Sequence, residues 1–533
     1  MRSLKKTDVR LSPVRTSGSA GNRFFDFGKH YFAVLEIEAE SAGPQEITLA
    51  VGEVLGEDGT IDREPGGSRV YQEQTVTLAA GVNRIAMQMR HKAYEVTGGM
   101  LSVTPEAVPF RYAEVRGFSG SLKAFQHAYY YEFDDAASDF VSSSDELNRI
   151  WELCKHTMKA TTPFGVFIDG DRERQAYEGD TYINQLSYFV CRSEPSIPGN
   201  TIDRLFAYPT WPTEWWLSMI PVIHDFALYT GDLERVRGWY GPMKKKLLLD
   251  GIGENGLLNV ALLPPVDLPG FPKMKNLRDI VDWPLSERDG YEFGACNLVP
   301  NCWQYMALRR AAEIAALLDE KEDVRFFEEK ASQSRKAIRA AMLKKGLFTD
   351  NPESDHTSLH SCIFPALWNV ADPAEKPAIL QLLRSKGLAC SVFAAQFLLE
   401  CCYGNRLADH GLQLMLSRGT RSWLNMLEKG ATITMEAWDN SVKPNQDWNH
   451  PWGAAPGNIL VRHLCGIRPL EPGFRKFIVD PQPGALRSFK VKTPTPHGAI
   501  ELEMSAPGCY RLTVPEGTTA LFQGKTLPAG TYE

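Results

Sequence analysis

The spacing of apolar residues changes twice along this chain, and this change is the strongest constraint on its fold. In residues 1–135 apolar and polar side chains alternate, as they do in Leu35–Glu40. Alternation with a period of two, interrupted by Gly, Pro and Asn, predicts antiparallel strands with one solvent-facing side. Residues 467–533 return to this pattern, as Ile500–Met504 shows. We therefore expect an antiparallel β-sandwich domain at each end of the chain.

The middle of the chain, residues 136–466, has the spacing of helices. Ser143 followed by Glu146 predicts a capping box, after which Leu147 and Ile150 fall on one helical face. Helical periodicity is clear in four segments and weaker in four others: 301–318, 321–344, 373–386 and 391–403, then 180–192, 213–230, 232–248 and 455–465. Strand patterns are nearly absent, which favours a toroid of helix pairs, although periodicity alone also allows a bundle or a solenoid.

The composition excludes several classes of protein. With 533 residues, 43% of them hydrophobic and 23% charged, the chain is typical of a globular protein with two to four domains. A net charge of −7 argues against a nucleic-acid or anionic-membrane partner, and no apolar run is long enough to span a membrane. Ten scattered cysteines without a CxxC pair indicate neither a zinc site nor a disulfide framework. The N-terminus lacks an apolar signal core, so we expect a cytoplasmic location, or a periplasmic or secreted one if a signal peptide was removed.

A dense run of charge lies inside the helical region. Residues 167–180 hold five carboxylates and two arginines, and their charged part directly follows the apolar stretch Phe164–Ile168. Buried charges must be paired or neutralised, so this is not the composition of an ordinary core segment. A solvated face is the simplest explanation of a charge run, but such faces rarely follow apolar aromatic stretches. We therefore predict a functional site around Glu173.

A second acidic segment, Thr432–Asp439, also lies among apolar and aromatic residues. The chain holds 12 tryptophans, 18 tyrosines and 26 phenylalanines, and stacking on sugar faces is one use for such rings. Two carboxylates in an aromatic cleft are what cleavage of a glycosidic bond requires, because one protonates the leaving oxygen and the other handles water or the sugar. Glu173 and Glu436 are the candidate pair.

Several motifs, taken in order, resemble glycoside hydrolase family 78, the α-L-rhamnosidases. Phe110–Phe118 looks like the family's Phe-Arg-Tyr-aromatic-Glu-Val-x-Gly strand, and Ser142–Trp151 looks like the first helix of its barrel. The acidic run resembles the block Asp-Cys-Pro-Gln-Arg-Asp-Glu-Arg-Leu-Gly-Trp-Thr-Gly-Asp. Ala431–Trp438 resembles Thr-Thr-x-Trp-Glu-x-Trp, and Asn449–Ala454 looks like the His-containing segment that follows.

This resemblance implies a central (α/α)6 barrel flanked by the two sandwiches, with domains at residues 1–135, 136–466 and 467–533. It also implies an inverting glycosidase that releases terminal L-rhamnose, with Glu173 as general acid and Glu436 as general base.

The sequence departs from the family at three places. Cys-Pro-Gln is missing from the acidic block, so its first Asp aligns ambiguously with Asp169. Gln175-Ala176-Tyr177 stands where the family has Leu-Gly-Trp, and Met435 stands where it has Trp. Because these residues shape the pocket, the resemblance supports the fold and the two catalytic carboxylates more strongly than it supports the substrate.

Further residues are expected to form the sugar pocket. Asp169 and Arg172 suit bidentate contacts to vicinal hydroxyls, and Trp438 is a candidate for the apolar wall that the methyl group of a 6-deoxy sugar needs. Glu214 fits either a third carboxylate of the site or an acid at a helix N-terminus. The remaining predicted substrate-binding residues are Tyr177, Asp180, Trp215, Asp282, Trp283, His450 and Trp452.

No cofactor or metal is expected. His356 and His360 have the i, i+4 spacing of helical metal ligands, but no third ligand pattern accompanies them. The oligomeric state is open.

Three other functions remain possible from the sequence alone. One is a six-hairpin glycosidase for another deoxy sugar, a pentose or an unsaturated uronide, for which Arg172 or Arg174 would bind the carboxylate. The second is a carbohydrate-binding relative without catalysis. The third is a polysaccharide lyase, which would need a Tyr or His base near a cation, and no such grouping is visible in the sequence.

Overall fold

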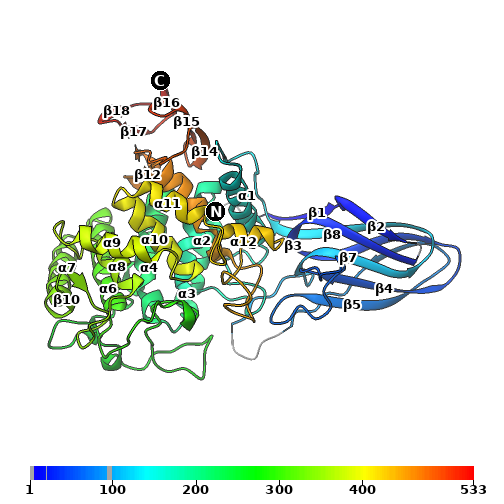
Figure 1. The fold of residues 1–533 in the computed structure, drawn as a ribbon, viewed down its shortest axis with the longest axis horizontal. Helices are drawn as coiled ribbons and strands as arrows, with labels where there is room; N and C mark the ends of the chain where they lie inside the picture. The colour runs from blue at the N-terminus through cyan, green and yellow to red at the C-terminus, as the bar shows by residue number, and fades with distance from the viewer. Residues whose placement is uncertain (1–4, 20, 93–98) are drawn as a thin grey trace.

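The computed structural model of this chain describes residues 5–19, 21–92 and 99–533. An N-terminal sheet projects from one side of a helical body, and a smaller group of C-terminal strands lies along another side (Figure 1). The predicted fold class, a helical centre between two β regions, is confirmed. The domain bounds at 135 and 466 stay a prediction.

In the described residues, eight antiparallel strands form the N-terminal sheet. They are β1 (Lys6–Leu11), β2 (Arg15–Ser19), β3 (Gly21–Ser41), β4 (Gln45–Gly52), β5 (Tyr71–Leu78), β6 (Gly81–Ala86), β7 (Val108–Phe118) and β8 (Ser121–Tyr131). The long strand β3 pairs with β7, β8 and β6, and it follows the alternation seen in the sequence. Leu35 and Ile37 are at most 1% exposed, whereas Glu36 and Glu38 form ion pairs with Arg10 at the surface.

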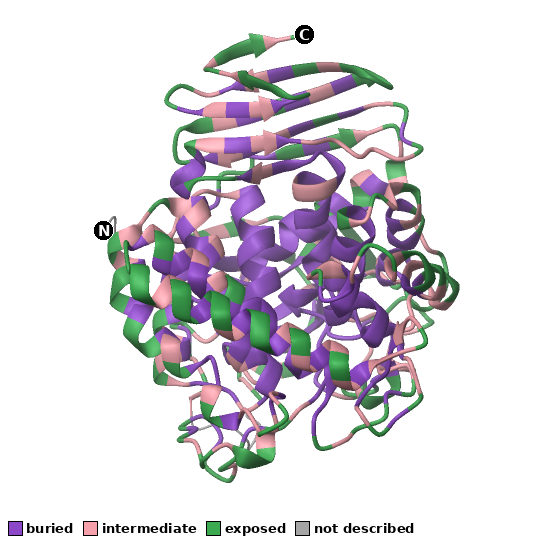
Figure 2. Ribbon diagram, turned by 90° about the vertical axis from the view of Figure 1, so that its left-hand side faces the viewer, coloured by how far each residue is buried: buried purple, intermediate pink, exposed green. Residues whose placement is uncertain are grey.

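The helical region is a closed ring of inner helices with outer helices around it. Its helices are α1 (Asp145–Ala160), α2 (Glu178–Cys191), α3 (Ser196–Ala207), α4 (Thr213–Thr230), α5 (Leu233–Lys245), α6 (Leu298–Leu317), α7 (Lys321–Met342), α8 (Leu359–Leu367), α9 (Lys376–Lys386), α10 (Val392–Gly404), α11 (Ala408–Met415), α12 (Trp423–Glu428) and α13 (Ala455–Ile459). α2 packs on α4, α4 on α6, α6 on α8, α8 on α10, α10 on α13, and α13 back on α2. Figure 2 shows the buried residues concentrated in the interior of this body.

Helices form at all eight segments that the periodicity indicated. Helices α3, α8, α11 and α12 lie outside these segments and were not predicted. α8 is buried on almost every side, so its sequence carries no amphipathic stripe. α12 has only six residues, too few for a helical period to show.

The C-terminal strands form two sheets. Their strands are β12 (Ile467–Pro469), β13 (Lys476–Val479), β14 (Phe489–Thr495), β15 (Gly498–Ala506), β16 (Cys509–Val514), β17 (Thr519–Phe522), β18 (Lys525–Leu527) and β19 (Gly530–Tyr532). The pairing is antiparallel except between β13 and β17. Strand β9 (Asp139–Ser142), which precedes α1, pairs with β14, so the start of the helical region is joined to the C-terminal sheet.

The N-terminal sheet also contacts the loops at one end of the helical ring. Ser68 Oγ donates to the Asn445 carbonyl (3.0 Å), and Asn449 Nδ2 donates to Glu53 Oε1 (2.9 Å). Gly67 has a φ of +56°, and a Cβ there would lie 2.7 Å from the Asn445 Cα. This close approach brings the loop after β4 beside the second acidic segment. Within residues 5–19, 21–92 and 99–533, no helix combines the length and apolarity needed to cross a bilayer.

Candidate active site

The acidic run forms a tight loop between α1 and α2. The Asp169 N–H donates to the Gln175 carbonyl (2.8 Å), and the Gln175 N–H donates back to Asp169 Oδ1 (2.9 Å). The Arg174 N–H donates to the Gly170 carbonyl (3.0 Å), with Arg174 itself in the left-handed region at φ 47°. These bonds close the loop at its base and present Arg172 and Glu173 at its tip.

Part of the charge in this run is structural. Arg174 is 1% exposed, and its guanidinium binds Asp171 Oδ1 (2.9 Å), Glu106 Oε1 (2.7 Å) and the Ala107 carbonyl (2.9 Å). Because Glu106 and Ala107 lie directly before β7, their contacts with Arg174 fix the loop against that segment. Neither residue lines the sugar-sized pocket described below.

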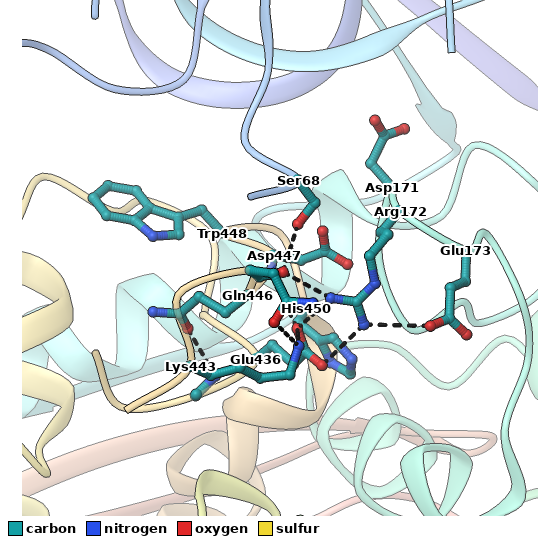
Figure 3. Close-up of polar contacts among 12 residues, drawn as sticks. Ser68, Asp171, Arg172, Glu173, Glu436, Lys443, Gln446, Asp447, Trp448 and His450 are labelled. Carbon is teal, nitrogen blue, oxygen red and sulfur yellow. Dashed lines mark hydrogen bonds and ion pairs between the residues drawn. The ribbon is translucent and has the colours of Figure 1, made fainter. Parts of the chain in front are cut away.

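Glu436 lies on the loop after α12 and is held from several directions (Figure 3). Arg172 donates from Nη1 to Glu436 Oε2 and from Nη2 to Glu436 Oε1, both at 3.0 Å. Lys443 Nζ and the Asp447 N–H each donate to Oε2 at 3.1 Å. Glu436 is 3% exposed, so this network replaces the water that a carboxylate would otherwise bind.

The surroundings keep Glu436 ionised. Burial alone would raise its pKa, but the positive charges of Arg172 and Lys443 outweigh burial and lower the pKa to about 2. At neutral pH the group is therefore a carboxylate that can only accept hydrogen bonds.

Glu173 points toward the same guanidinium. Arg172 Nη2 lies 3.3 Å from Glu173 Oε1, and the Tyr177 hydroxyl donates to Oε2. The Glu173 side chain is 20% exposed, so it has access to the cavity. Burial, and next the charge of Glu173, raise the pKa of Asp169 well above its usual range. Burial and the charge of Glu436 do the same to the pKa of Asp180.

These side chains surround a pocket of about 250 Å³. Pockets for drug-sized ligands hold about 300–1,000 Å³, so this one suits a single sugar residue. The predicted site residues that line it are Asp169, Arg172, Glu173, Tyr177, Asp180, Trp215, Trp283, Glu436, His450 and Trp452. Glu173 and Glu436, 263 positions apart in sequence, thus line the same pocket, as the prediction of paired carboxylates requires.

Two predicted substrate-binding residues lie elsewhere. Asp282 is fully buried and accepts hydrogen bonds from His360 Nε2 (2.8 Å) and the Ser391 N–H (2.9 Å). Trp438 is also fully buried, with its Nε1 donating to the Cys390 carbonyl (2.7 Å). Both side chains have satisfied partners outside the pocket, so their positions argue against contact with the sugar and for a structural role.

The loop between α5 and α6 supplies pocket residues that the sequence did not indicate. These are Phe271, Met274, Arg278 and Ile280, joined by Trp211 from the segment before α4. Glu214, in the first turn of α4, accepts from the N–H groups of Ile280 (3.2 Å) and Val281 (2.8 Å). Glu214 therefore holds this loop in place and does not itself line the pocket. A Pro- and Gly-rich loop gives no period that would show which of its side chains face inward.

His450 lies in the pocket wall as a neutral side chain. Its ring packs on Trp452 with centroids 4.4 Å apart, and its Nε2 is 3.7 Å from Asp180 Oδ2. Burial lowers the pKa of His450 to about 3. A neutral imidazole beside a buried carboxyl group can donate one hydrogen bond and accept another from a sugar hydroxyl.

The two histidines with helical metal-ligand spacing do not share a site. His356 lies before α8 with its Nδ1 2.6 Å from Asp350 Oδ2, whereas His360, inside α8, contacts Asp282. Across the described ranges, no three His, Cys, Asp or Glu side chains are grouped as they would be around a metal ion.

Comparisons with known proteins agree with this arrangement. Residues 135–464 match the family model described as the bacterial α-L-rhamnosidase six-hairpin glycosidase domain, and residues 466–528 match the bacterial α-L-rhamnosidase C-terminal domain. An α-L-rhamnosidase from Alteromonas sp. (strain LOR) is 22% identical over 459 residues, which cover 78% of this chain and 48% of that protein. The chain thus spans about half the length of that relative.

Solved structures share the fold. An α-L-rhamnosidase from Aspergillus terreus superposes with a TM-score of 0.79 at 17% identity, over 98% of this chain and 63% of that one. A Streptomyces avermitilis α-L-rhamnosidase complexed with L-rhamnose superposes with a TM-score of 0.77 at 17% identity, over 96% of this chain and 49% of that one.

Proposed function

The chain belongs to the bacterial α-L-rhamnosidase six-hairpin glycosidase family, and from this premise we propose that it is an α-L-rhamnosidase that releases terminal L-rhamnose from glycosides or oligosaccharides. One observation carries the proposal: Glu173 and Glu436 both line a sugar-sized pocket and both contact the guanidinium of Arg172. This is the pairing of carboxyl groups that hydrolysis of a glycosidic bond needs.

In the proposed reaction Glu173 is the general acid. When Arg172 has turned from Glu173 to the sugar, Glu173 in its protonated form gives its proton to the glycosidic oxygen as the bond to the sugar breaks. Its 20% exposure and its place at the tip of the loop support this role, since a proton donor must reach the leaving oxygen at the pocket mouth. The Tyr177 hydroxyl, which donates to the other oxygen of Glu173, would keep the carboxyl group oriented.

Glu436 is the general base, which takes a proton from the attacking water. In the ligand-free protein its oxygens are occupied by Arg172 and Lys443, and its pKa of about 2 makes it a weak base. We propose that, when substrate binds, sugar hydroxyls accept hydrogen bonds from the N–H groups of Arg172. The carboxylate would then lose part of the charge that lowers its pKa, and it could receive the proton.

Inversion at the anomeric carbon is the proposed stereochemical outcome. Arg172 Nη2 lies 3.0 Å from Glu436 Oε1 and 3.3 Å from Glu173 Oε1, so both carboxylates contact the same nitrogen. Inversion requires that substrate displace this nitrogen and that a water molecule lie beside Glu436.

The pocket lining supports a 6-deoxy sugar. Trp215, Phe271 and Met274 offer an apolar surface for a methyl group, while Asp169, Asp180 and His450 are placed for hydroxyls. This division matches what a site for L-rhamnose needs.

An uronide glycosidase is the second candidate, and Arg278 favours it. Arg278 adds a second guanidinium to the pocket lining, and it forms no ion pair within the part of the chain that the structure describes. A guanidinium in that position would bind the carboxylate of an unsaturated uronide.

Proton NMR of the sugar released from an aryl α-L-rhamnoside tests the proposal, because it reports both acceptance of the sugar and its anomeric form. We expect the first product signal to be β-L-rhamnose, which later mutarotates. Initial release of α-L-rhamnose would contradict inversion. Release of an unsaturated uronide from its aryl glycoside, with no turnover of the rhamnoside, would favour the second candidate.

A further inference from the structure

A second and larger cavity lies next to the sugar pocket. It has a volume of about 770 Å³ and lies between the N-terminal sheet and the acidic loop. Its walls come from the segment between β4 and β5, from β5 itself, and from the residues that follow β6. Arg172 lines both cavities, so the two are adjacent at the residue that contacts Glu173 and Glu436. We refer to the larger cavity as the N-terminal groove.

The N-terminal groove is rich in positive charge. Arg63, Arg69, Arg90 and Lys92 line it in addition to Arg172. This clustering contrasts with the whole chain, which carries a net charge of −7. A positively charged concave surface focuses the electrostatic field, so it attracts anionic ligands even though the whole protein is negatively charged.

Much of this charge is not neutralised by neighbouring carboxylates. Arg69 Nη1 donates to Asn440 Oδ1 (3.1 Å) and to the Pro444 carbonyl (3.2 Å), both uncharged acceptors. Over the described ranges, Arg90 and Lys92 form no ion pair with any carboxylate, and both are exposed.

The carboxylates of the N-terminal groove are largely occupied. Glu73 binds Arg116 (2.6 Å), and Asp171 binds Arg174 (2.8 Å). Glu64 is the acidic lining residue that forms no ion pair among the described residues. The groove therefore presents a surplus of cationic groups to a ligand.

The position of the N-terminal groove indicates which part of the substrate it would bind. A sugar held between Glu173 and Glu436 has its glycosidic oxygen near Glu173, and the group attached to that oxygen must leave past Glu173 and Arg172. The N-terminal groove begins at Arg172. The leaving group is therefore the part of the substrate that would occupy the groove.

We propose that the N-terminal groove binds an anionic sugar on the leaving-group side of the scissile bond, with Arg69, Arg90 and Lys92 facing its carboxylate or sulfate ester. This inference rests on the proposed function, because it concerns the aglycone of the same substrate. Guanidinium and ammonium groups pair with both anions, and the guanidinium fork adds bidentate geometry. The enzyme then prefers rhamnose attached to an acidic glycan over rhamnose attached to a neutral one.

The test uses three rhamnosyl disaccharides that share one linkage. The second sugar is glucuronate, 6-O-sulfoglucose or glucose, so the substrates differ only at C6. We expect kcat/KM to be highest for one or both anionic substrates, and their relative rates identify which anion the groove favours. Raising the salt from about 0.01 M to about 1 M shortens the Debye length from about 30 Å to about 3 Å, and the preference should shrink accordingly.

The variant Arg90→Gln/Lys92→Gln should lower the ratio of anionic to neutral kcat/KM at least about fivefold at low salt. The matched control is Arg84→Gln, because Arg84 is 80% exposed on β6 and lies outside the groove. This control should leave the ratio unchanged. An equal ratio in the wild-type protein and the double variant would overturn the proposed groove.

Equilibrium binding of the same three disaccharides separates this inference from the proposed function. One possible result is that rhamnose is released from none of the substrates, but the glucuronate compound binds more tightly than the glucose compound. This result would support the anion-binding groove and contradict the proposed hydrolase activity. The opposite result is that rhamnose is released from all three disaccharides with equal kcat/KM and that the three bind with equal affinity. This result would support the hydrolase activity and contradict the anion-binding groove.

Discussion

Arg172 donates from both terminal nitrogens to the two carboxylate oxygens of Glu436, at 3.0 Å each, across 264 positions of sequence. One of these nitrogens also lies 3.3 Å from Glu173. A single guanidinium thus fixes the proposed base relative to the proposed acid. The positions of the two carboxylates are therefore not independent, and a change at Arg172 should alter both.

Arg172→Gln removes the charge that most strongly opposes the effect of burial on Glu436. The pKa of Glu436, about 2 in the native protein, should rise, so the acidic limb of the kcat/KM profile should move to higher pH. We also expect kcat/KM at its optimum to fall by about 10²-fold, because the two carboxylates lose their common anchor. Arg172→Lys is the control, since it keeps the charge without the fork and should move the limb less. An unchanged limb in Arg172→Gln would contradict this assignment.

Glu173→Gln and Glu436→Gln should each lower kcat on an aryl rhamnoside by about 10²–10⁴-fold, the usual contribution of general acid or base catalysis. Glu152→Gln serves as a surface control, because the Glu152 side chain is 57% exposed on α1. Steady-state kinetics and circular dichroism of all three variants separate lost chemistry from lost folding. Turnover within a few-fold of wild type in either site variant would refute its catalytic role.

Replacing Trp215 should weaken substrate binding, whereas replacing Trp438 should lower the stability of the fold. Trp215→Ala removes part of the pocket lining and should raise KM by about tenfold. Trp438→Phe removes the 2.7 Å hydrogen bond to the Cys390 carbonyl, so it should lower the free energy of unfolding by about 1–3 kcal/mol with KM unchanged. KM measurements and urea unfolding of both variants provide the comparison. A raised KM in Trp438→Phe would restore this residue to the sugar site.

Asp447 makes stability depend on pH. Burial raises its pKa to about 7 from an unfolded value of 3.8, so between these pH values the folded chain binds more protons than the unfolded chain. Stability should therefore fall as pH rises from about 4 to about 7. Asp447→Asn removes this titration, so the decrease in the free energy of unfolding over this pH range should become smaller by about 1–4 kcal/mol. Urea unfolding of both proteins at pH 5 and pH 8 measures it, and identical pH dependence would contradict the buried, protonated state.

The buried pair Lys246–Glu178 supports the start of α2, which follows the acidic loop. Lys246 Nζ lies 3.1 Å from Glu178 Oε1, and Glu178 is fully buried. Lys246→Met should destabilise the fold by about 3–5 kcal/mol, because it leaves an uncompensated carboxylate inside the protein. The double variant Lys246→Met/Glu178→Gln should recover most of that loss. Thermal unfolding of the three proteins checks this, and a single variant as stable as the double one would argue against a buried charge.

Local pattern in the sequence was enough to predict the long strands and most helices of this chain, but not α3, α8, α11 and α12. Alternation predicted strands such as β3, and helical spacing predicted α6 and α7, because each pattern reports which side of an element faces the core. The charge of the acidic run and its resemblance to a known family drew attention to Glu173 and Glu436.

Only the tertiary structure decided which charges of the acidic run face the pocket. Arg172 and Arg174 are two residues apart in the same loop, yet one holds Glu436 and the other is buried against Asp171 and Glu106. It also decided that Trp438 packs away from the pocket and that Phe271 lines it. The physical reason is that a loop has no period. The direction of each of its side chains is set by contacts with residues far away in sequence, so the local pattern contains no record of it.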